Sequence, residues 1–332
     1  MIVNDHGARK HAAGDIQARL LLVLLCLSWG LTWPAMKIAL AGIPPLSMRT
    51  LTAALGALTL FLICVAKRSG FRVPGARAWG HVVVASFLNV VGFSLFSAFA
   101  LMAAATSRVA ILAYTLPIWT VLLAWLVLNE RPNRLQVIAI ALCVVGLAIL
   151  IYPLAATGIP LGAVFAVGSA WSWAAGTVYI KWARIDADPM AVASWQLTIA
   201  FFVIAGCMFA FGGGLDLHNA HAAALVGVVF AGIVGNGIAY GLWFAIVRRV
   251  SAATASLGIL GIPVIGVLAS VLILGDRPTL ADLIGFGFIF AASACVLLTP
   301  HSPAAESATP RAAPPIQRRA RPSGSPDRPA RR

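Results

Sequence analysis

Apolar residues occur along this chain in long unbroken runs and do not alternate with polar ones as they would in a soluble domain. A helix needs about 20 mostly apolar residues to cross the roughly 30 Å of hydrocarbon in a bilayer. Ten segments have that character: residues 19–41, 46–66, 79–103, 106–128, 134–152, 160–182, 189–211, 222–246, 251–274 and 280–298. Each should be helical, because backbone polar groups cannot remain unpaired in lipid. The pattern predicts an all-α integral membrane protein with ten transmembrane helices.

Composition supports this prediction. Of the 332 residues, 61% are hydrophobic and 10% are charged, and the mean hydropathy is +0.93. A soluble domain carries about 25% charged residues, so a soluble protein of one or two domains is excluded. The first apolar run is longer than the core of a cleaved signal peptide, and we expect it to remain as the first helix.

The net charge of +14 suggests nucleic-acid binding until its distribution is considered. Lysine and arginine are concentrated in loops and tails, and cytoplasmic loops of membrane proteins carry such an excess. If the N-terminus is cytoplasmic, most of the basic residues fall on the cytoplasmic side. The exceptions lie at helix ends on the other face: Lys37, Arg49, Arg108 and Arg277. We therefore predict a multi-pass protein of the bacterial inner membrane with both termini cytoplasmic, and no nucleic-acid partner.

The same pattern divides the chain into four parts. Residues 1–18 form a polar cytoplasmic segment, 19–152 and 160–298 each hold five predicted helices, and 300–332 form a basic tail. The tail is rich in Pro, Ala, Ser and Arg, cannot bury a core, and should be disordered. Its arginines can contact anionic lipid headgroups, or they can simply reinforce the topology.

The two halves repeat one another at an offset of about 146 residues. Pro117 precedes Glu130 by thirteen residues, as Pro263 precedes Asp276. The pairs Trp29 with Lys37 and Trp173 with Lys181 share a spacing of eight residues. Likewise Asn89, Phe93 and Phe96 match Asn236, Tyr240 and Trp243 at positions i, i+4 and i+7, which lie on one face of a helix.

Five helices in each repeat is an odd number, so the second repeat must enter the membrane upside down. Inverted repeats of this kind recur in secondary transporters, where they give the inward-open and outward-open states similar energies. The sequence thus predicts ten transmembrane helices arranged as two inverted five-helix repeats.

These motifs, in this order and doubled, resemble the drug/metabolite transporter superfamily, in particular its EamA-type ten-helix transporters. The residues that carry the resemblance are Trp29-Gly30, Lys37, Arg49, the stretch 110–125 and Glu130, with a weaker second copy at 263–285. The resemblance implies a secondary transporter that exports amino acids or small metabolites. Two departures are Asp276 in place of a second Glu, and Trp195-Gln196 where a second Arg49 would stand.

The centre of the predicted bundle holds aromatic and amide side chains and no carboxylate. A charged group there costs about 2.5–3.5 kcal/mol on insertion scales, so its absence argues against a proton relay through a buried acid. Aromatic walls with a few amides suit amphipathic, amino-acid-like solutes. The alternative for each asparagine is a hydrogen bond between helices. The candidate substrate-binding residues are Trp29, Trp33, Asn89, Tyr114, Trp171, Trp173, Asn236, Tyr240 and Trp243.

A second set of residues has properties suited to gating or charge recognition. Pro117 and Pro263 each lack an amide hydrogen and should interrupt their helices at mid-depth. The two lysines either extend to the membrane interface or pair with a substrate carboxylate or with Glu130. The arginines near the outer boundary can attract anions. The full set is Lys37, Arg49, Arg108, Pro117, Glu130, Lys181 and Pro263.

Signatures of enzymes are missing from the sequence. There is no glycine-rich phosphate loop and no convincing metal-ligand spacing, so we expect no catalytic residues, no metal and no cofactor. The expected partners are a small-molecule substrate and the lipid bilayer, and monomer and homodimer both stay open. Two other functions remain: a passive solute facilitator, and a membrane sensor or assembly partner that acts through the basic tail.

Overall fold

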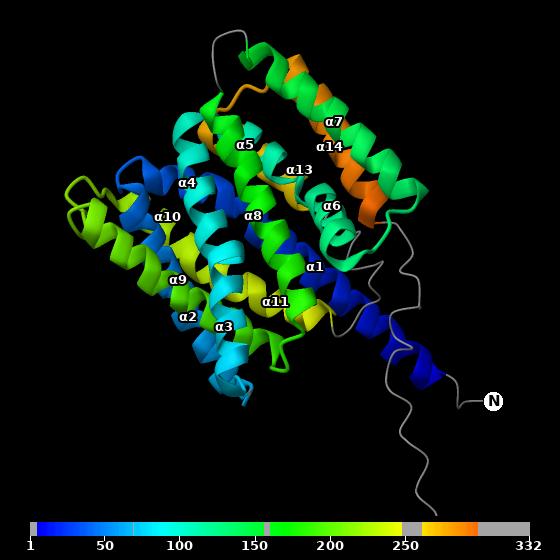
Figure 1. Ribbon diagram of the computed structural model, residues 1–332, viewed down its shortest axis with the longest axis vertical. Helices are drawn as coiled ribbons and strands as arrows, with labels where there is room; N and C mark the ends of the chain where they lie inside the picture. The colour runs from blue at the N-terminus through cyan, green and yellow to red at the C-terminus, as the bar shows by residue number, and fades with distance from the viewer. Residues whose placement is uncertain (1–4, 69, 156–159, 248–260, 298–332) are drawn as a thin grey trace, which may run out of the picture. The chain divides into compact units, whose positions relative to one another are not determined.

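A computed structural model describes residues 5–68, 70–155, 160–247 and 261–297, and every regular element within them is a helix (Figure 1). The first half contains α1 (Asp5–Leu40), α2 (Pro45–Ala66), α3 (Gly75–Ser86), the π-helix η1 (Phe87–Gly92), α4 (Phe93–Ala103), α5 (Thr106–Ala113), α6 (Leu116–Leu128) and α7 (Arg134–Ala155). The second half contains α8 (Leu161–Ala183), α9 (Pro189–Phe211), α10 (Ala222–Val229), the π-helix η2 (Phe230–Ile238), α11 (Ala239–Val247), α13 (Gly261–Leu274) and α14 (Leu280–Leu297).

Eight helical stretches in the described residues are long and apolar enough to cross a membrane, and α13 and α14 are shorter apolar helices. The prediction of an all-helical, multi-pass membrane protein is therefore confirmed. The first part of the predicted helix 251–274, Arg248, Arg249 and the basic tail 300–332 lie outside the described residues. The count of ten crossings and the inverted arrangement stay predictions.

The helix boundaries differ from the predicted ones at two places. Helix α1 begins at Asp5, well before residue 19, so the polar N-terminal segment continues the first helix. The predicted helix 106–128 is divided into α5 and α6 by a turn at Tyr114 and Thr115. Pro117 lies in the first turn of α6, where its missing amide hydrogen is tolerated. The interruption expected from Pro117 is thus a break between two helices.

Two of the membrane-spanning stretches contain a π-helical segment. Residues 75–103 run through α3, η1 and α4, and residues 222–247 run through α10, η2 and α11. In a π-helix the hydrogen bonds join residues i and i+5, and such segments are rare outside functional sites. Asn89 lies in η1 and Asn236 lies in η2. Phe96, which the α-helical spacing places near Phe93, is exposed and contacts Phe165.

The helices pack in pairs that join the two halves. Helix α2 packs against α9, α5 against α13, and α7 against α14, and the last pair lies side by side in Figure 1. Helix α1 packs against α13 and α10, while α8 packs against α6 and α4. Small residues permit several of these contacts, as is common between membrane helices. A Cβ atom on Gly146 of α7 would lie 3.0 Å from the Gly285 carbonyl oxygen of α14.

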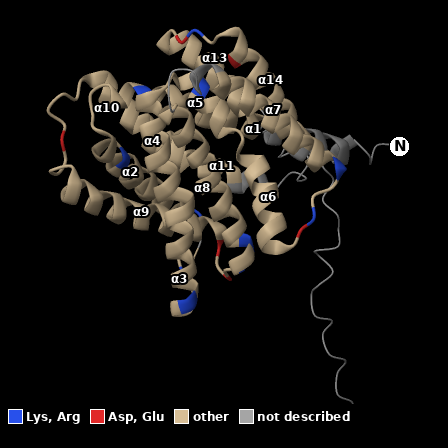
Figure 2. Cartoon of the chain, turned by 45° about the horizontal axis from the view of Figure 1, so that its top comes forward, with Lys and Arg blue, Asp and Glu red and all other residues tan. Residues whose placement is uncertain are grey.

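Charged residues avoid the middle of the helices. Figure 2 shows most lysines, arginines, aspartates and glutamates near helix ends or in loops, with long uncharged stretches between them. This distribution is the one that a hydrocarbon layer requires. The interior that remains is built from aromatic, aliphatic and small polar side chains, and the candidate site lies there.

Candidate functional site

Six aromatic side chains from four helices form a continuous chain of ring contacts, which we call the aromatic cluster. Its members are Trp29 and Trp33 of α1, Phe93 of α4, Trp173 of α8, and Tyr240 and Trp243 of α11. The ring centroids are 6.2 Å apart for Trp243 and Trp29, 6.1 Å for Trp29 and Tyr240, 6.1 Å for Tyr240 and Trp173, 5.0 Å for Trp173 and Phe93, and 6.4 Å for Phe93 and Trp33. Sequence analysis selected all of these residues except Phe93.

Spacing along the helices explains how this cluster forms. Trp29 and Trp33 lie four residues apart and therefore share one face of α1. Phe93 is the first residue of α4, directly after the π-helix η1, and its ring lies between the rings of Trp33 and Trp173. Because the contributing helices come from both halves of the chain, relative movement of the halves would reshape the cluster.

Each π-helix accepts a hydrogen bond from the helix beside it. The Trp29 indole donates to the Gly235 carbonyl oxygen of η2 at 3.1 Å, and the Ser172 hydroxyl donates to the Leu88 carbonyl oxygen of η1 at 2.5 Å. Gly235 and Leu88 are separated by 147 residues, the offset of the sequence repeat. The donors come from α1 and α8, which begin the two halves. The two π-helices are therefore anchored in matching ways.

The two asparagines face different neighbours. Asn236 donates through its side-chain nitrogen to the Thr52 carbonyl oxygen of α2 at 3.2 Å and packs on Gly56. Asn89 is buried against Gly176 of α8, and its side-chain oxygen has no hydrogen-bond partner in the described residues. The contact of Asn236 is the interhelical hydrogen bond considered as the alternative to substrate binding. Asn89 retains an unused acceptor.

Two other candidate residues stand apart from the cluster. Tyr114 lies at the break between α5 and α6, where its carbonyl oxygen accepts a hydrogen bond from Ser293 of α14 at 3.1 Å. Trp171 is 45% exposed although Trp173 belongs to the cluster, because residues two positions apart on a helix lie on different faces. Neither takes part in the ring contacts described above, and their roles in binding stay predictions.

Two ion pairs join the halves at opposite ends of the stretch 106–128. Arg108 binds Asp282 through two hydrogen bonds of 2.7 and 2.8 Å, and the two side chains are 22% and 6% exposed. Lys181 binds Glu130 at 2.6 and 2.8 Å, and these side chains are 59% and 48% exposed. We call the two regions the Asp282 end and the Glu130 end. The second pair is the contact that sequence analysis proposed for Lys181.

Sequence analysis missed Asp282, although a local signal was present. Thr279 and Asp282 form reciprocal hydrogen bonds at the start of α14, with Asp282 accepting from the Thr279 amide and the Thr279 hydroxyl accepting from the Asp282 amide. This is a capping box, whose Thr-x-x-acid spacing is readable in the sequence. Its partner Arg108 lies 174 residues away, and no local pattern connects them.

Lys37 and Arg49 lie at the Asp282 end without an ion-pair partner in the described residues. The Lys37 ammonium donates to the carbonyl oxygen of Leu101. Arg49 is 4% exposed, and its guanidinium donates to the Ser97 hydroxyl at 2.6 Å and to the Met36 sulfur at 3.0 Å. The Nε of Arg49 has no partner. A buried charge whose partner is removed costs about 3–5 kcal/mol, so this isolated arginine is unusual.

Pro263, the last of the candidate residues, is buried in the first turn of the described part of α13. Neighbouring Gly266 approaches Trp33 and the Gly30 carbonyl oxygen, so this part of α13 packs closely against α1. Whether the helix is interrupted before Pro263 concerns residue 259, which lies outside the described residues.

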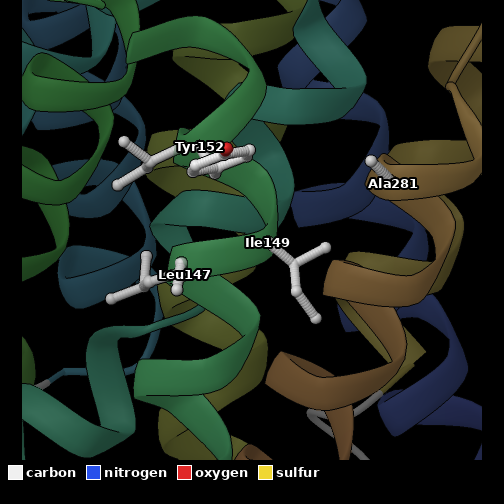
Figure 3. A pocket seen from close by; sticks show the side chains of 6 residues that line it. Leu147, Ile149, Tyr152 and Ala281 are labelled. Carbon is white, nitrogen blue, oxygen red and sulfur yellow. The ribbon is translucent and has the colours of Figure 1, made fainter. Parts of the chain in front are cut away.

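Two pockets of the described residues are lined by no member of the aromatic cluster. An open groove of about 740 Å³ is lined by apolar residues of α7 and by Ala281 of α14 (Figure 3). Tyr152, which borders it, is 83% exposed. A smaller pocket of about 330 Å³ is lined by Gly92, Leu95, Phe96, Phe99 and Phe165. Neither offers the charged or amide groups that would orient a polar solute, so the aromatic cluster remains the candidate site.

Comparison with known protein families gives a match to each half of the chain. The model of the EamA-like transporter family matches residues 17–152 and again residues 160–298. The chain belongs to this family. The resemblance inferred from the sequence is thereby confirmed. The two matched ranges differ by two residues at one boundary from the predicted repeats, 19–152 and 160–298.

Relatives of this chain are also named as transporters or exporters. The chain is 23% identical over 274 residues to an uncharacterized transporter of Bacillus subtilis, covering 81% of this chain and 93% of the relative. It is 26% identical over 285 residues to a probable amino-acid metabolite efflux pump of Salmonella typhimurium, covering 82% and 91%. It is 24% identical over 273 residues to a probable terminal-alkyne amino-acid exporter of Streptantibioticus cattleyicolor, covering 80% and 88%.

A solved crystal structure shares the fold of this family member. The TM-score is 0.61 at 23% sequence identity, and the match covers 84% of this chain and 96% of the other. At that identity the match shows the fold and does not identify a substrate.

Proposed function

We propose that this protein is a secondary transporter that exports small amphipathic, amino-acid-like metabolites across the bacterial inner membrane by alternating access. The observation that carries the proposal is the aromatic cluster, which is assembled from helices of both halves. A solute held there would contact both halves at once, so movement of one half against the other would expose it to either side.

The chemistry of the cluster favours an amphipathic solute. Six aromatic rings supply apolar contact area, and Asn89, four residues before Phe93 in the sequence, has an unused acceptor. Small-molecule sites typically combine apolar walls with a few placed polar groups. Relatives named as amino-acid metabolite efflux pumps support the same substrate class and the export direction.

The arrangement of the helices supports alternating access. If the halves are inverted copies, each packed pair of helices should have a counterpart at the repeat offset. Helix α1 corresponds to α8 and α13 corresponds to α6, and α1 packs against α13 as α8 packs against α6. The matching hydrogen bonds to Gly235 and Leu88 have it as well. Inverted repeats of this kind underlie transport by rocking of one half against the other.

Transport is tested by efflux from washed cells that overexpress the protein, with extracellular metabolites compared between variants. Trp173→Ala should abolish release of the transported solute, because Trp173 contacts both Phe93 and Tyr240. Trp182→Ala is the matched control, since it removes the same type of side chain from an exposed position on the same helix. Both variants must be expressed at the wild-type level.

The result that contradicts the proposal is equal release from the wild type, Trp173→Ala and cells without the protein. A passive facilitator is the second candidate, because the aromatic cluster contains no acid that could carry a proton. Collapse of the proton gradient by a protonophore separates the two. A coupled exporter then loses accumulation against a gradient, whereas a facilitator equilibrates its solute at an unchanged rate.

A further inference from the structure

The arginine and the lysine at the Asp282 end approach the same face of α4. Arg49 donates to Ser97, and Lys37 donates to the carbonyl oxygen of Leu101. Ser97 and Leu101 are four residues apart, so they lie one above the other on one helical face. Two positive charges from α1 and α2 thus converge within about one helical turn, and in the described residues both donate to uncharged groups only.

Arg108 shows what a satisfied guanidinium looks like in the same molecule. Its Nε and Nη2 atoms bind the two oxygens of Asp282 at 2.7 and 2.8 Å. In Arg49 the same edge has only the Ser97 hydroxyl at Nη2 and nothing at Nε. This edge matches the geometry of a carboxylate, which accepts two parallel hydrogen bonds from arginine. The contact at Nη1 is to a thioether sulfur, which is a weak acceptor.

The cationic pair is connected to the aromatic cluster by short helical steps. Lys37 lies four residues after Trp33 on α1, and Ser97 lies four residues after Phe93 on α4. The Ser97 hydroxyl donates to the Phe93 carbonyl oxygen at 2.6 Å, which leaves its lone pairs directed to Arg49. The rings of Trp33 and Phe93 contact each other at 6.4 Å. A solute of modest length can therefore reach both features.

We propose that Arg49, Lys37 and Ser97 form an oxyanion site that binds the carboxylate of the transported solute, while Trp33 and Phe93 hold its apolar part. This inference rests on the proposed transport function and narrows its substrate class to amphipathic carboxylates. It also explains why a buried arginine is kept without a protein counter-ion: the counter-ion is the solute.

The test uses the purified full-length protein and two probes that differ in one group, indole-3-acetate and indole-3-acetamide. Binding of each is measured by calorimetry and by the shift in melting temperature. The wild type should bind the carboxylate at least about tenfold more tightly than the amide, since hydrogen bonds to a charged group are the stronger kind. Arg49→Gln should reduce this preference to less than about twofold and leave amide binding unchanged.

The melting temperature without probe separates a binding role from a structural one. Arg49→Gln should keep or raise it, because the substitution removes a buried charge that has no partner. Arg108→Gln is the matched control and should lower it, because Asp282 is then left buried alone. If Arg49→Gln does not fold, the partly exposed Lys37→Gln gives the second test, with an expected severalfold loss of the carboxylate preference.

Equal binding of the two probes by the wild type, or binding of neither, would overturn the proposal. So would a carboxylate preference that survives in Arg49→Gln. These outcomes are distinct from failure of the transport proposal: a carboxylate preference in the purified protein without any solute release from cells supports the site and contradicts the transporter. Solute release without a carboxylate preference supports the transporter and contradicts the site.

Discussion

The Asp282 end and the Glu130 end of the molecule each hold one ion pair between the two halves, yet the pairs differ in strength. Arg108 and Asp282 form a two-point contact that is largely buried. Lys181 and Glu130 are both about half exposed, and water competes for each. Buried pairs are costly to break, whereas exposed pairs contribute about 0–1 kcal/mol. The Glu130 end is therefore the easier end to open.

Lys37 sharpens the contrast, because it occupies the position in the first half that Lys181 occupies in the second. The sequence repeat matches Lys37 to Lys181 and Asp276 to Glu130. The counterpart of the pair of Lys181 with Glu130 would therefore be a pair of Lys37 with Asp276. In the structure only the first of these pairs forms among the described residues, while Lys37 contacts Leu101 and Asp276 accepts from the Ser107 amide at 2.7 Å. Matching positions thus have different partners, as the proposed alternating access would require in any single state if the halves are inverted copies.

The largest expected effect comes from breaking the pair at the Asp282 end. Arg108→Gln should lower the free energy of unfolding by about 3 kcal/mol, because it leaves the Asp282 carboxylate buried without its cation. The measurement is chemical or thermal unfolding of the purified protein. Arg108→Gln combined with Asp282→Asn should recover most of this loss, since neither side chain of the former pair then carries a charge.

Arg277→Gln serves as the control for that experiment, because Arg277 is an exposed cation at the same end. Its effect should stay within about 0.5 kcal/mol. If Arg108→Gln costs no more than Arg277→Gln, the Asp282 end is not held by its ion pair and the proposed difference between the two ends is wrong.

A smaller effect tests whether the packing around the two π-helices is equally close. A Cβ atom on Gly176 would overlap the Asn89 side-chain oxygen, and one on Gly56 would overlap the Cβ of Asn236. Gly176→Ala and Gly56→Ala should each cost about 2 kcal/mol of unfolding free energy through overpacking, measured in the same assay. Equal costs would indicate equivalent packing around the two π-helices.

The control for these glycines is Gly206 of α9, whose added Cβ would meet no atom within 4 Å. Gly206→Ala should stabilise the helix by about 0.5–1 kcal/mol, because alanine has the higher helix propensity. A gain from Gly176→Ala as well would contradict the close contact with Asn89.

Much of the fold could be predicted from the sequence, because a bilayer imposes length and polarity on every helix. In the described residues the apolar runs located the apolar helices within a few residues, apart from the early start of α1 and the break at Tyr114. The first part of the predicted helix 251–274 lies outside those residues. The π-helices could not be predicted, since an apolar run has no periodic signal that separates i+5 from i+4 hydrogen bonding. Phe96 lies outside the aromatic cluster and contacts Phe165.

The candidate site was predictable to the extent that spacing determines it. Trp29 and Trp33 share a face of one helix, and the repeat matches Trp29 to Trp173 and Phe93 to Tyr240. The structure brings these rings together in one cluster. Contacts between distant segments did not follow. The pairing of Arg108 with Asp282 and the isolation of Arg49 depend on how whole helices pack, and a single sequence holds no local record of that.

The smallest expected effect comes from breaking the pair at the Glu130 end. Glu130→Gln should change the free energy of unfolding by less than about 1 kcal/mol, because both partners are solvated before and after the substitution. In 1 M salt the Debye length falls to about 3 Å, so the difference between variant and wild type should disappear, as followed by unfolding at low and high salt. Exchange of the charges in Glu130→Lys with Lys181→Glu should restore the low-salt value. A loss as large as that of Arg108→Gln, or one that persists at high salt, would mean that the Glu130 end is held as firmly as the Asp282 end. Opening at that end would then require additional binding energy from the solute, whereas opening an exposed and weakly held ion pair would not.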